Sequence, residues 1–453
     1  MVGAVLAVSV AVVGALAIAG VIGSQSRPIV VGILHSRTGP MAESERGVID
    51  ATVLALEQLN EGGGVLGRPV RWVIADGGSD EQVFAREAVR LVEEERVSVI
   101  FGCWTSASRK AVRPIVEQAN VLLFYPVQYE GCETSPNIVY LGAAPNQQII
   151  PAVSWSLQHL GTSCYLVGSD YIFPRVANAI IRDQVSALGG EVVGEAYVPL
   201  TSTAMEGLVE RIVEAAPAVI FNTINGAANL TFFDALAGAT RGRRPIPVMS
   251  FSIAEVELKA MGDLGSVAGQ YASWNYFQSI NQPANQAFVE SFRGRFGRDR
   301  AVSDPMEAAY VGVKLWAQAV AEAGRLATSD VQRALHRQSL EAPEGVVSID
   351  LETQHSWKVA RIGRVSKDGQ FEVVWASDCP LRPVPFPVFR TKTEWRDLVR
   401  ELYEGWGKRW SSPSDAIEFL SDGADGSEET NLSDGVEESP ELVRDEAKGE
   451  ASR

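Results

Sequence analysis

The sequence predicts an α/β protein of two lobes, each a doubly wound parallel sheet, joined by a hinge with several crossovers. Short apolar runs alternate with helical segments from residue 28 onward, and the alternation restarts near residue 147. After Gly345 the pattern changes to short strands separated by turns. Apolar runs joined by helical segments are typical of parallel strands, whose sheets are covered by helices on both faces.

The first lobe begins with a strand at 28–35 and an amphipathic helix at 43–60. Val48, Ala51, Ala55 and Leu59 fall on one face of that helix, and three glycines at 62–64 end it. The same alternation continues through strands at 71–75, 97–101 and 121–124 and helices at 82–95 and 107–120.

The second lobe is expected to repeat this pattern. Its elements alternate through 147–160, 164–167, 173–188, 191–197, 206–215, 218–222, 229–239 and 246–251. A strand at 270–276 and helices at 283–296, 305–324 and 329–337 follow. The antiparallel strands are expected at 346–350, 357–365 and 371–375, with a hairpin turn at 367–369, and a last helix at 391–410.

These elements suggest a division of the chain into discontinuous lobes. We expect 28–145 with 252–338 in the first lobe and 146–251 with 339–385 in the second. Residues 386–410 would form a helical extension, and 411–453 an acidic tail. The tail holds 13 acidic and 3 basic residues, which gives −10 of the chain's −16. Such a composition predicts disorder from Ser411 onward.

Residues 2–26 carry no charge. The segment 2–23 alone would make a helix of about 33 Å, long enough to span a hydrocarbon core of about 30 Å. It is either a signal peptide, with Ala17-Ile18-Ala19 as a cleavage site, or an uncleaved membrane anchor. Both interpretations predict export.

Several classes of function are disfavoured by composition and spacing. Basic residues are not clustered, which argues against nucleic acid as a partner. No histidine or cysteine pattern has metal-ligand spacing, so neither a metal nor a cofactor is expected. One disulfide among the four cysteines is possible if the chain is exported. The glycines at 62–64 follow a helix and lack phosphate-loop spacing.

Catalysis has one weak candidate, Ser36 beside His35 at a strand end. No G-x-S-x-G turn and no suitably placed acid support it. The better signal is a group of uncharged side chains at predicted strand ends, which comprises Ser36, Trp104, Thr105, Ser106 and Tyr125. Ligands of such sheets bind at the carboxyl ends of the strands. These residues could also be core aromatics and caps, but together they favour a site for a small, neutral, polar molecule.

Longer strings carry a resemblance to a known family. They include ILHSRTG at 33–39, FGCWTSASRKAV at 101–112, LLFYPVQYEG at 122–131, VGSDYIFPR at 167–175 and VMSFSIAE at 248–255. Over about 29–375 the chain resembles the type I periplasmic binding proteins of ABC transporters, in the branch for urea and short-chain amides. Trp104 and Val127-Gln128 resemble the urea-transport receptors more than the amide-sensing regulators of amidase expression.

The resemblance implies how a ligand is held. Urea or a short-chain amide would lie between two closing lobes and be presented to the permease subunits of an ABC transporter. The expected ligand-binding residues are Ser36, Trp104, Thr105, Ser106, Tyr125, Val127, Gln128, Tyr171, Phe173 and Ser252. The Ser106 hydroxyl and N–H would donate to the ligand carbonyl, and Trp104 and Tyr171 would sandwich the amide. A sensor of the amidase-regulator type, a signalling receptor and an amidohydrolase stay open as alternatives.

Overall fold

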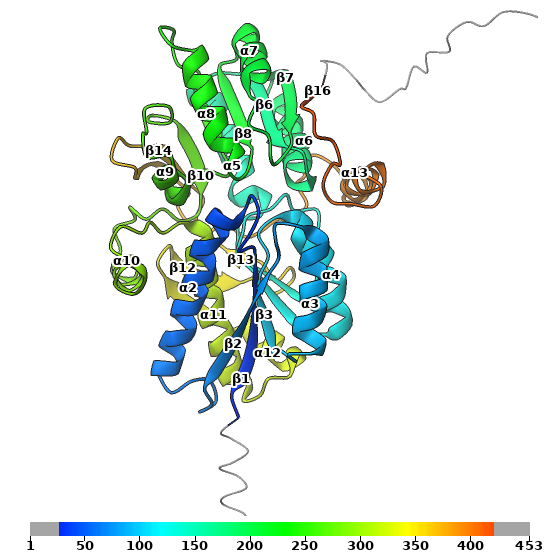
Figure 1. The fold of residues 1–453 in the computed structure, drawn as a ribbon, viewed down its shortest axis with the longest axis vertical. Coiled ribbons are helices and arrows are strands. Elements are labelled where there is room, and N and C mark those ends of the chain that lie inside the picture. The colour runs from blue at the N-terminus through cyan, green and yellow to red at the C-terminus, as the bar shows by residue number, and fades with distance from the viewer. Residues whose placement is uncertain (1–26, 421–453) are drawn as a thin grey trace, which may run out of the picture.

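A computed structural model describes residues 27–420, which form two α/β lobes stacked along the long axis (Figure 1). The leader at 1–26 and the tail beyond Leu420 lie outside the described residues. The first lobe holds a five-stranded sheet in the order β2-β1-β3-β4-β5. Its strands, all paired in parallel, are β1 (Ile29–His35), β2 (Val70–Asp76), β3 (Val99–Gly102), β4 (Leu122–Tyr125) and β5 (Ile138–Tyr140).

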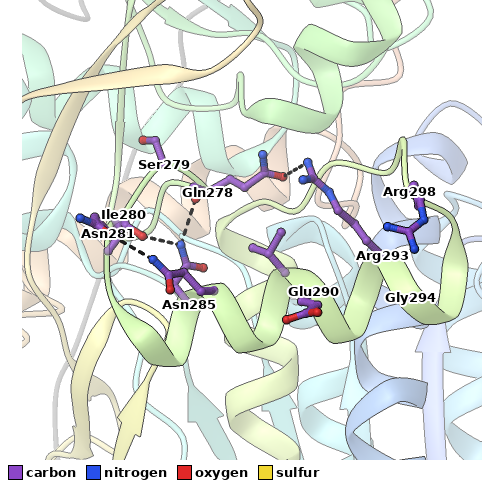
Figure 2. A pocket seen from close by; sticks show the side chains of 11 residues that line it. Gln278, Ser279, Ile280, Asn281, Asn285, Glu290, Arg293, Gly294 and Arg298 are labelled. Carbon is purple, nitrogen blue, oxygen red and sulfur yellow. Dashed lines mark hydrogen bonds between the residues drawn. The ribbon is translucent and has the colours of Figure 1, made fainter.

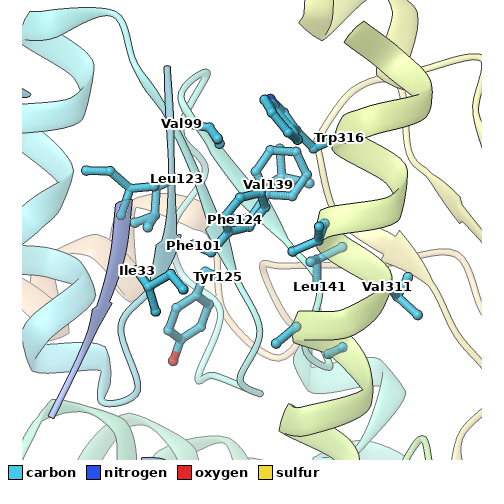
Figure 3. Close-up of a cluster of buried hydrophobic side chains, with 14 of the residues drawn as sticks. Ile33, Val99, Phe101, Leu123, Phe124, Tyr125, Val139, Leu141, Val311 and Trp316 are labelled. Carbon is cyan, nitrogen blue, oxygen red and sulfur yellow. The ribbon is translucent and has the colours of Figure 1, made fainter. Parts of the chain in front are cut away.

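Helices cover both faces of this first sheet. On one face α2 (Ala42–Glu61) packs against α11 (Asp304–Ala323), and on the other α3 (Glu81–Glu93) packs against α4 (Ser106–Ala119). The core lies between α11 and the strands (Figure 3). There the Phe101 ring packs on Phe124 in a tilted arrangement and meets Trp316 edge to face, with ring centroids 5.4 and 5.8 Å apart. Burial of such large side chains is the main stabilisation of the lobe.

The second lobe holds an eight-stranded sheet in the order β15-β14-β10-β9-β8-β6-β7-β16. The strands from β10 to β7 along this order run parallel. At the edges, β14 pairs antiparallel with β10, β15 pairs antiparallel with β14, and β16 pairs antiparallel with β7. Their bounds are β6 (Ser163–Ser169), β7 (Glu191–Val198), β8 (Val219–Thr223), β9 (Val248–Ser250), β10 (Tyr271–Trp274), β14 (Arg361–Val365), β15 (Phe371–Ala376) and β16 (Glu418–Leu420).

Two groups of helices pack on opposite faces of the second sheet. One group is α7 (Glu206–Ala215), α8 (Ala228–Ala239) and α9 (Glu255–Met261). The other is α5 (Ile149–His159), α6 (Ile172–Ala187) and α13 (Lys392–Gly405). The remaining elements are α10 (Pro283–Phe296), α12 (Thr328–Leu335), a short 3-10 helix (Pro145–Gln147) and a small sheet of β11 (Ser339–Ala342), β12 (Gly345–Ile349) and β13 (Ser356–Trp357).

The chain crosses between the lobes more often than the predicted division allows. Strand β10 pairs with β9 in the second lobe, whereas 252–338 was expected in the first. Conversely, β11 and β12 place Ala342, Val347 and Ile349 in the first-lobe core, whereas 339–385 was expected in the second. The expected strand 357–365 is two strands, β13 and β14, in different sheets. An apolar run predicts a strand but does not specify the sheet it joins.

The C-terminal extension is longer and more ordered than predicted. Helix α13 ends at Gly405, and the chain then runs on to β16, which pairs antiparallel with the edge strand β7. Ser412 N–H donates to the Asp170 carbonyl at 3.0 Å, and Arg211 lies 3.9 Å from the Phe419 ring centroid. The prediction of disorder from Ser411 onward is therefore wrong for 411–420. An edge strand offers unpaired backbone groups, and a short segment satisfies them despite an acidic composition.

All four cysteines are free thiols, three of them buried. Between residues 27 and 420, no helix combines the length and apolar character that a membrane span requires.

Candidate functional site

The ends of β3 and β4 meet at one point of the first lobe. After β3, Cys103 takes a left-handed φ of 67°, and the chain turns into α4. The Thr105 hydroxyl caps that helix by accepting from Ser108 N–H at 3.1 Å, which makes Ser106 its first residue. The Tyr125 hydroxyl donates to the Trp104 carbonyl at 2.7 Å. Trp104, Thr105, Ser106 and Tyr125, predicted from separate strand ends, thus lie together.

Tyr171 and Phe173 approach this point from the second lobe. They stand at the start of α6, with Tyr171 at its N-terminal cap and the two ring centroids 6.2 Å apart. Both rings belong to a buried cluster that also contains Ala107 of α4. Ser106, Tyr171 and Phe173 are each only 2% exposed. The two lobes therefore touch over the strand ends, and a molecule held there would be shielded from water.

A buried charge network lies directly behind Ser106. The Ser106 hydroxyl donates to the Glu130 carboxylate and accepts from Arg109 Nη1 at 3.0 Å. Arg109 also donates to Glu130 at 3.1 Å and to Glu133 at 3.0 Å. Lys110 Nζ lies 3.1 Å from Glu133 and 3.4 Å from Glu130. These contacts hold the Ser106 side chain in one orientation.

Arg113 also contacts Glu133 at 3.2 Å and Glu117 at 3.3 Å, so three cations face three carboxylates and the network is neutral overall. Burial alone would raise the pKa of Glu133, but Lys110 and Arg109 outweigh it and hold that pKa well below its usual range. Burial would lower the pKa of Arg109, and Glu133 and Glu130 raise it. The Arg109 guanidinium also lies 4.8 Å from the Tyr125 ring centroid. Burial, with Tyr125 and Glu130 nearby, keeps the pKa of Tyr171 far above its usual range, so its phenol stays neutral.

The sequence prediction of a lining without charge is therefore incomplete. The Ser106 hydroxyl proton is committed to Glu130, so the expected donation by this hydroxyl to a ligand carbonyl is wrong. The signal that was missed is Arg109-Lys110 near the N-terminus of a helix. Cations are unfavourable at that end of the helix dipole unless carboxylates compensate them.

Val127 and Gln128 form the junction between the lobes. A side chain at Gly142 would collide with the Val127 backbone, so the two segments pack at van der Waals distance only with glycine there. The Gln128 amide donates across the junction to the Phe251 carbonyl at 2.9 Å. Its Oε1 atom is buried and has no partner among residues 27–420. A buried acceptor without a donor is costly, so this oxygen is available to a ligand N–H.

Ser36 and Ser252 are engaged within their own lobes. Ser36 Oγ accepts from Ser79 N–H at 2.9 Å and thereby ties β1 to the loop before α3. Ser252 Oγ accepts from Asn229 at 3.2 Å and donates to the Ile224 carbonyl. Both serines are buried beside the strand ends, but their hydroxyls already have partners.

His35 also has a structural partner, because its Nδ1 lies 2.8 Å from the buried Glu45 carboxylate. The Ser36 hydroxyl is hydrogen-bonded by Ser79 N–H and not by His35, so the structure does not assemble the Ser36–His35 pair as a nucleophile and base. Within the described part of the chain, no cluster of three or more His, Cys, Asp or Glu side chains is arranged to hold a metal ion.

A cavity of about 730 Å³ lies elsewhere, along α10 and the loop before it (Figure 2). Its polar side chains largely satisfy one another. Asn285 donates to the Gln278 carbonyl at 2.9 Å, and Arg293 donates to the Gln278 side chain at 3.3 Å. This cavity is open to solvent and away from the strand ends, so it is a weaker ligand site than the junction of the lobes.

Comparisons with known proteins agree with this architecture. Residues 29–392 match the family model described as periplasmic binding protein domain. A relative called Leu/Ile/Val-binding protein homolog 6, from Brucella melitensis, is 25% identical over 294 residues, which are 63% of this chain and 74% of the relative. A protein named limonene hydroxylase, from Geobacillus stearothermophilus, is 30% identical over 118 residues. The chain spans only 22% of that protein's length.

Solved structures show the same fold. A solute binding protein of an ABC transporter from Rhodopseudomonas palustris HaA2, in complex with p-hydroxybenzoic acid, superposes with a TM-score of 0.71 at 23% identity. The match covers 78% of this chain and 98% of that one. A leucine binding protein from Thermotoga maritima gives a TM-score of 0.67 at 18% identity, covering 77% and 98%.

Proposed function

The chain belongs to the family of periplasmic binding proteins, and from that premise we propose that it captures urea or a short-chain amide for an ABC transporter. It would act outside the cytoplasmic membrane and hand the ligand to the permease subunits. The observation that carries the choice of ligand is the neutral network behind Ser106, enclosed where the two lobes touch.

Charge balance favours a neutral ligand. Arg109 and Lys110 are already paired with Glu130 and Glu133, and Arg113 with Glu133 and Glu117, so neither sign of charge is in excess. A carboxylate or ammonium group placed beside them would lack a partner, and an unpaired buried charge is costly. Amides avoid this cost because they present only hydrogen-bond donors and an acceptor.

The contacts of Ser106 suggest how an amide would be oriented. Because its hydroxyl proton goes to Glu130, the hydroxyl oxygen is an acceptor for a ligand N–H. The first N–H groups of α4 lack partners inside the helix and would donate to the ligand carbonyl. The unpartnered Gln128 Oε1 would accept a second N–H. Trp104 and Tyr171 would lie on the two faces of the planar amide.

Size limits the affinity. Urea has about four heavy atoms, and a ceiling of about −1.5 kcal/mol per atom corresponds to a Kd in the tens of micromolar. Such affinity requires nearly every donor and acceptor of the ligand to be matched. The lobes must therefore close over it by a hinge motion, as in other two-lobed binding proteins.

Binding without turnover can be tested by thermal shift. At about 1 mM, a ligand with a Kd in the tens of micromolar stabilises its protein by about 2 kcal/mol. We expect urea, formamide or acetamide to raise the Tm of protein lacking residues 1–26, with no ammonia released. Leucine, which the name of a related protein suggests as a rival, should have no effect. Ammonia release at a catalytic rate would favour an amidohydrolase, and a shift with leucine alone would refute the choice of ligand.

Export has a separate test. The uncharged segment 2–26 motivates it, and a phosphatase fused after Gly39 is active only if the junction leaves the cytoplasm. We expect an active fusion. An inactive fusion with soluble cytosolic protein would favour the amidase-regulator alternative.

A receptor role in signalling is the second candidate, and one observation favours it. Residues 393–420 extend past the matched family region, pack on the second lobe and reach the first at Glu81, which accepts from Trp410 N–H at 3.0 Å. A segment that contacts both lobes would report closure to a partner protein. Deletion of a dedicated permease would abolish urea uptake under the first proposal and leave it unchanged under this one.

A further inference from the structure

A second cavity, of about 520 Å³, lies between α4 of the first lobe and the C-terminal extension. It is separate from the strand-end site, by which we mean the group of Trp104, Ser106 and Tyr171. Lys110 lines the cavity and also belongs to the charge network behind Ser106. Its far wall is α13 and the segment to Trp410, most of which follows the region matched by the family model. We propose that this cavity is a second binding site, for a small organic carboxylate with an aromatic or similarly flat apolar body.

Cations line this cavity on both sides. Lys110 and Arg113 come from α4, and Arg396 and Arg400 lie one helical turn apart on α13. Glu133 also lines the cavity, but its carboxylate already faces Arg109, Lys110 and Arg113.

The two cations of α13 differ in their partners. Arg400 contacts Asp397 at 2.7 Å. Arg396 has no ion pair with any residue between 27 and 420, and its guanidinium lies 5.5 Å from the Phe386 ring centroid. It is the cation best able to receive a carboxylate from outside, since a guanidinium binds that group through two parallel hydrogen bonds.

Aromatic rings supply the other half of the site. Phe386, Tyr403 and Trp410 line the cavity, and the Tyr403 and Trp410 ring centroids lie 4.2 Å apart. Lys110 Nζ lies 5.2 Å from the Trp410 ring centroid. A flat apolar body would stack on these rings while its carboxylate reached Arg396 and Arg400. An inorganic anion would use only the cations, so the rings favour an organic ligand.

The extension that forms this wall is firmly held by the second lobe. Trp395 of α13 is fully buried and donates to the Pro387 carbonyl at 2.8 Å. Arg390 forms two hydrogen bonds with Asp183 of α6, at 2.6 and 2.8 Å. The cavity therefore has one wall on each lobe, and its ligand would touch both.

Titration of the full-length protein in mild detergent with benzoate tests the proposal, and benzamide serves as the uncharged control of the same shape. We expect benzoate to bind and Arg396→Ala with Arg400→Ala to weaken it about tenfold or more, the loss that one good charged hydrogen bond accounts for. Arg241→Ala with Arg243→Ala, an equal change of charge on an exposed loop of the second lobe, should leave binding unchanged.

Ser106→Ala separates the two sites, because it alters the strand-end site and leaves the arginines in place. Benzoate affinity should be unchanged in that variant. Equal binding of benzamide and benzoate, or wild-type benzoate affinity in the double arginine variant, would overturn the proposal. Loss of benzoate binding only in Ser106→Ala would place the carboxylate in the strand-end site instead, and would overturn the proposed neutral ligand as well.

Discussion

Replacement of Glu130 by glutamine probes the charge network that positions Ser106. The Glu130 carboxylate is fully buried, accepts from Ser106 and Arg109, and lies 3.4 Å from Lys110. The substitution keeps the shape but removes one of two buried negative charges, which leaves two buried cations against Glu133. Breaking a buried pair by removing one partner costs about 3–5 kcal/mol.

Calorimetric unfolding measures this loss without denaturant, which matters because urea is the candidate ligand. For a unit of about 400 residues, 3–5 kcal/mol corresponds to a fall in Tm of about 4–6 °C. Glu372→Gln is the matched control, because Glu372 and its partner Arg364, 2.7 Å away, are 58% and 49% exposed. An exposed pair contributes about 0–1 kcal/mol, so its loss should shift Tm by about 1 °C or less. Equal shifts in the two variants would refute the view that the network is tightly coupled and buried.

Three further predictions concern the site, the pH and the extension. Ser106→Ala should weaken urea or amide binding by about 1–3 kcal/mol, because a ligand N–H loses its acceptor, while Ser252→Ala, whose hydroxyl serves Ile224 and Asn229, should leave the affinity unchanged by calorimetric titration. Burial raises the pKa of Glu255 from 4.5 to about 8, so the folded protein binds a proton there that the unfolded chain releases. The stabilisation from this bound proton is complete below pH 4.5 and is lost as the pH rises to about 8. Glu255→Gln should therefore flatten the decline in Tm over that pH range. Truncation after Leu420 should leave Tm and affinity unchanged, whereas truncation after Trp410 should lower Tm because β7 loses its partner β16; equal Tm values for the two truncations would contradict the observed pairing.

The alternating pattern of the chain carries most of the fold, since strands and helices arise from local apolar periodicity. The lobe that each element joins does not follow from this periodicity. Strand β10 was expected in the first lobe, yet its backbone continues the second-lobe sheet beside β9. The split of 357–365 into β13 and β14 occurs at a crossing between sheets, which periodicity does not record.

The candidate site was partly accessible to the same reasoning. Strand ends predicted that Trp104, Ser106 and Tyr125 would meet, because parallel strands end at one edge of the sheet. The charges behind Ser106 were missed, since Glu130 is 21 residues from Arg109 and their contact depends on tertiary packing. Order in 411–420 was missed for a similar reason, because it comes from the unpaired edge of β7 and not from the segment's own composition.

A crystal structure of the protein grown with acetamide tests the central claim most directly. We predict ligand density between Trp104 and Tyr171, with the amide within hydrogen-bond distance of the Ser106 hydroxyl and of the first N–H groups of α4. The Arg109, Lys110, Glu130 and Glu133 side chains should keep the contacts described above. Density at the cavity along α10 instead, with none at the strand ends, would contradict the account.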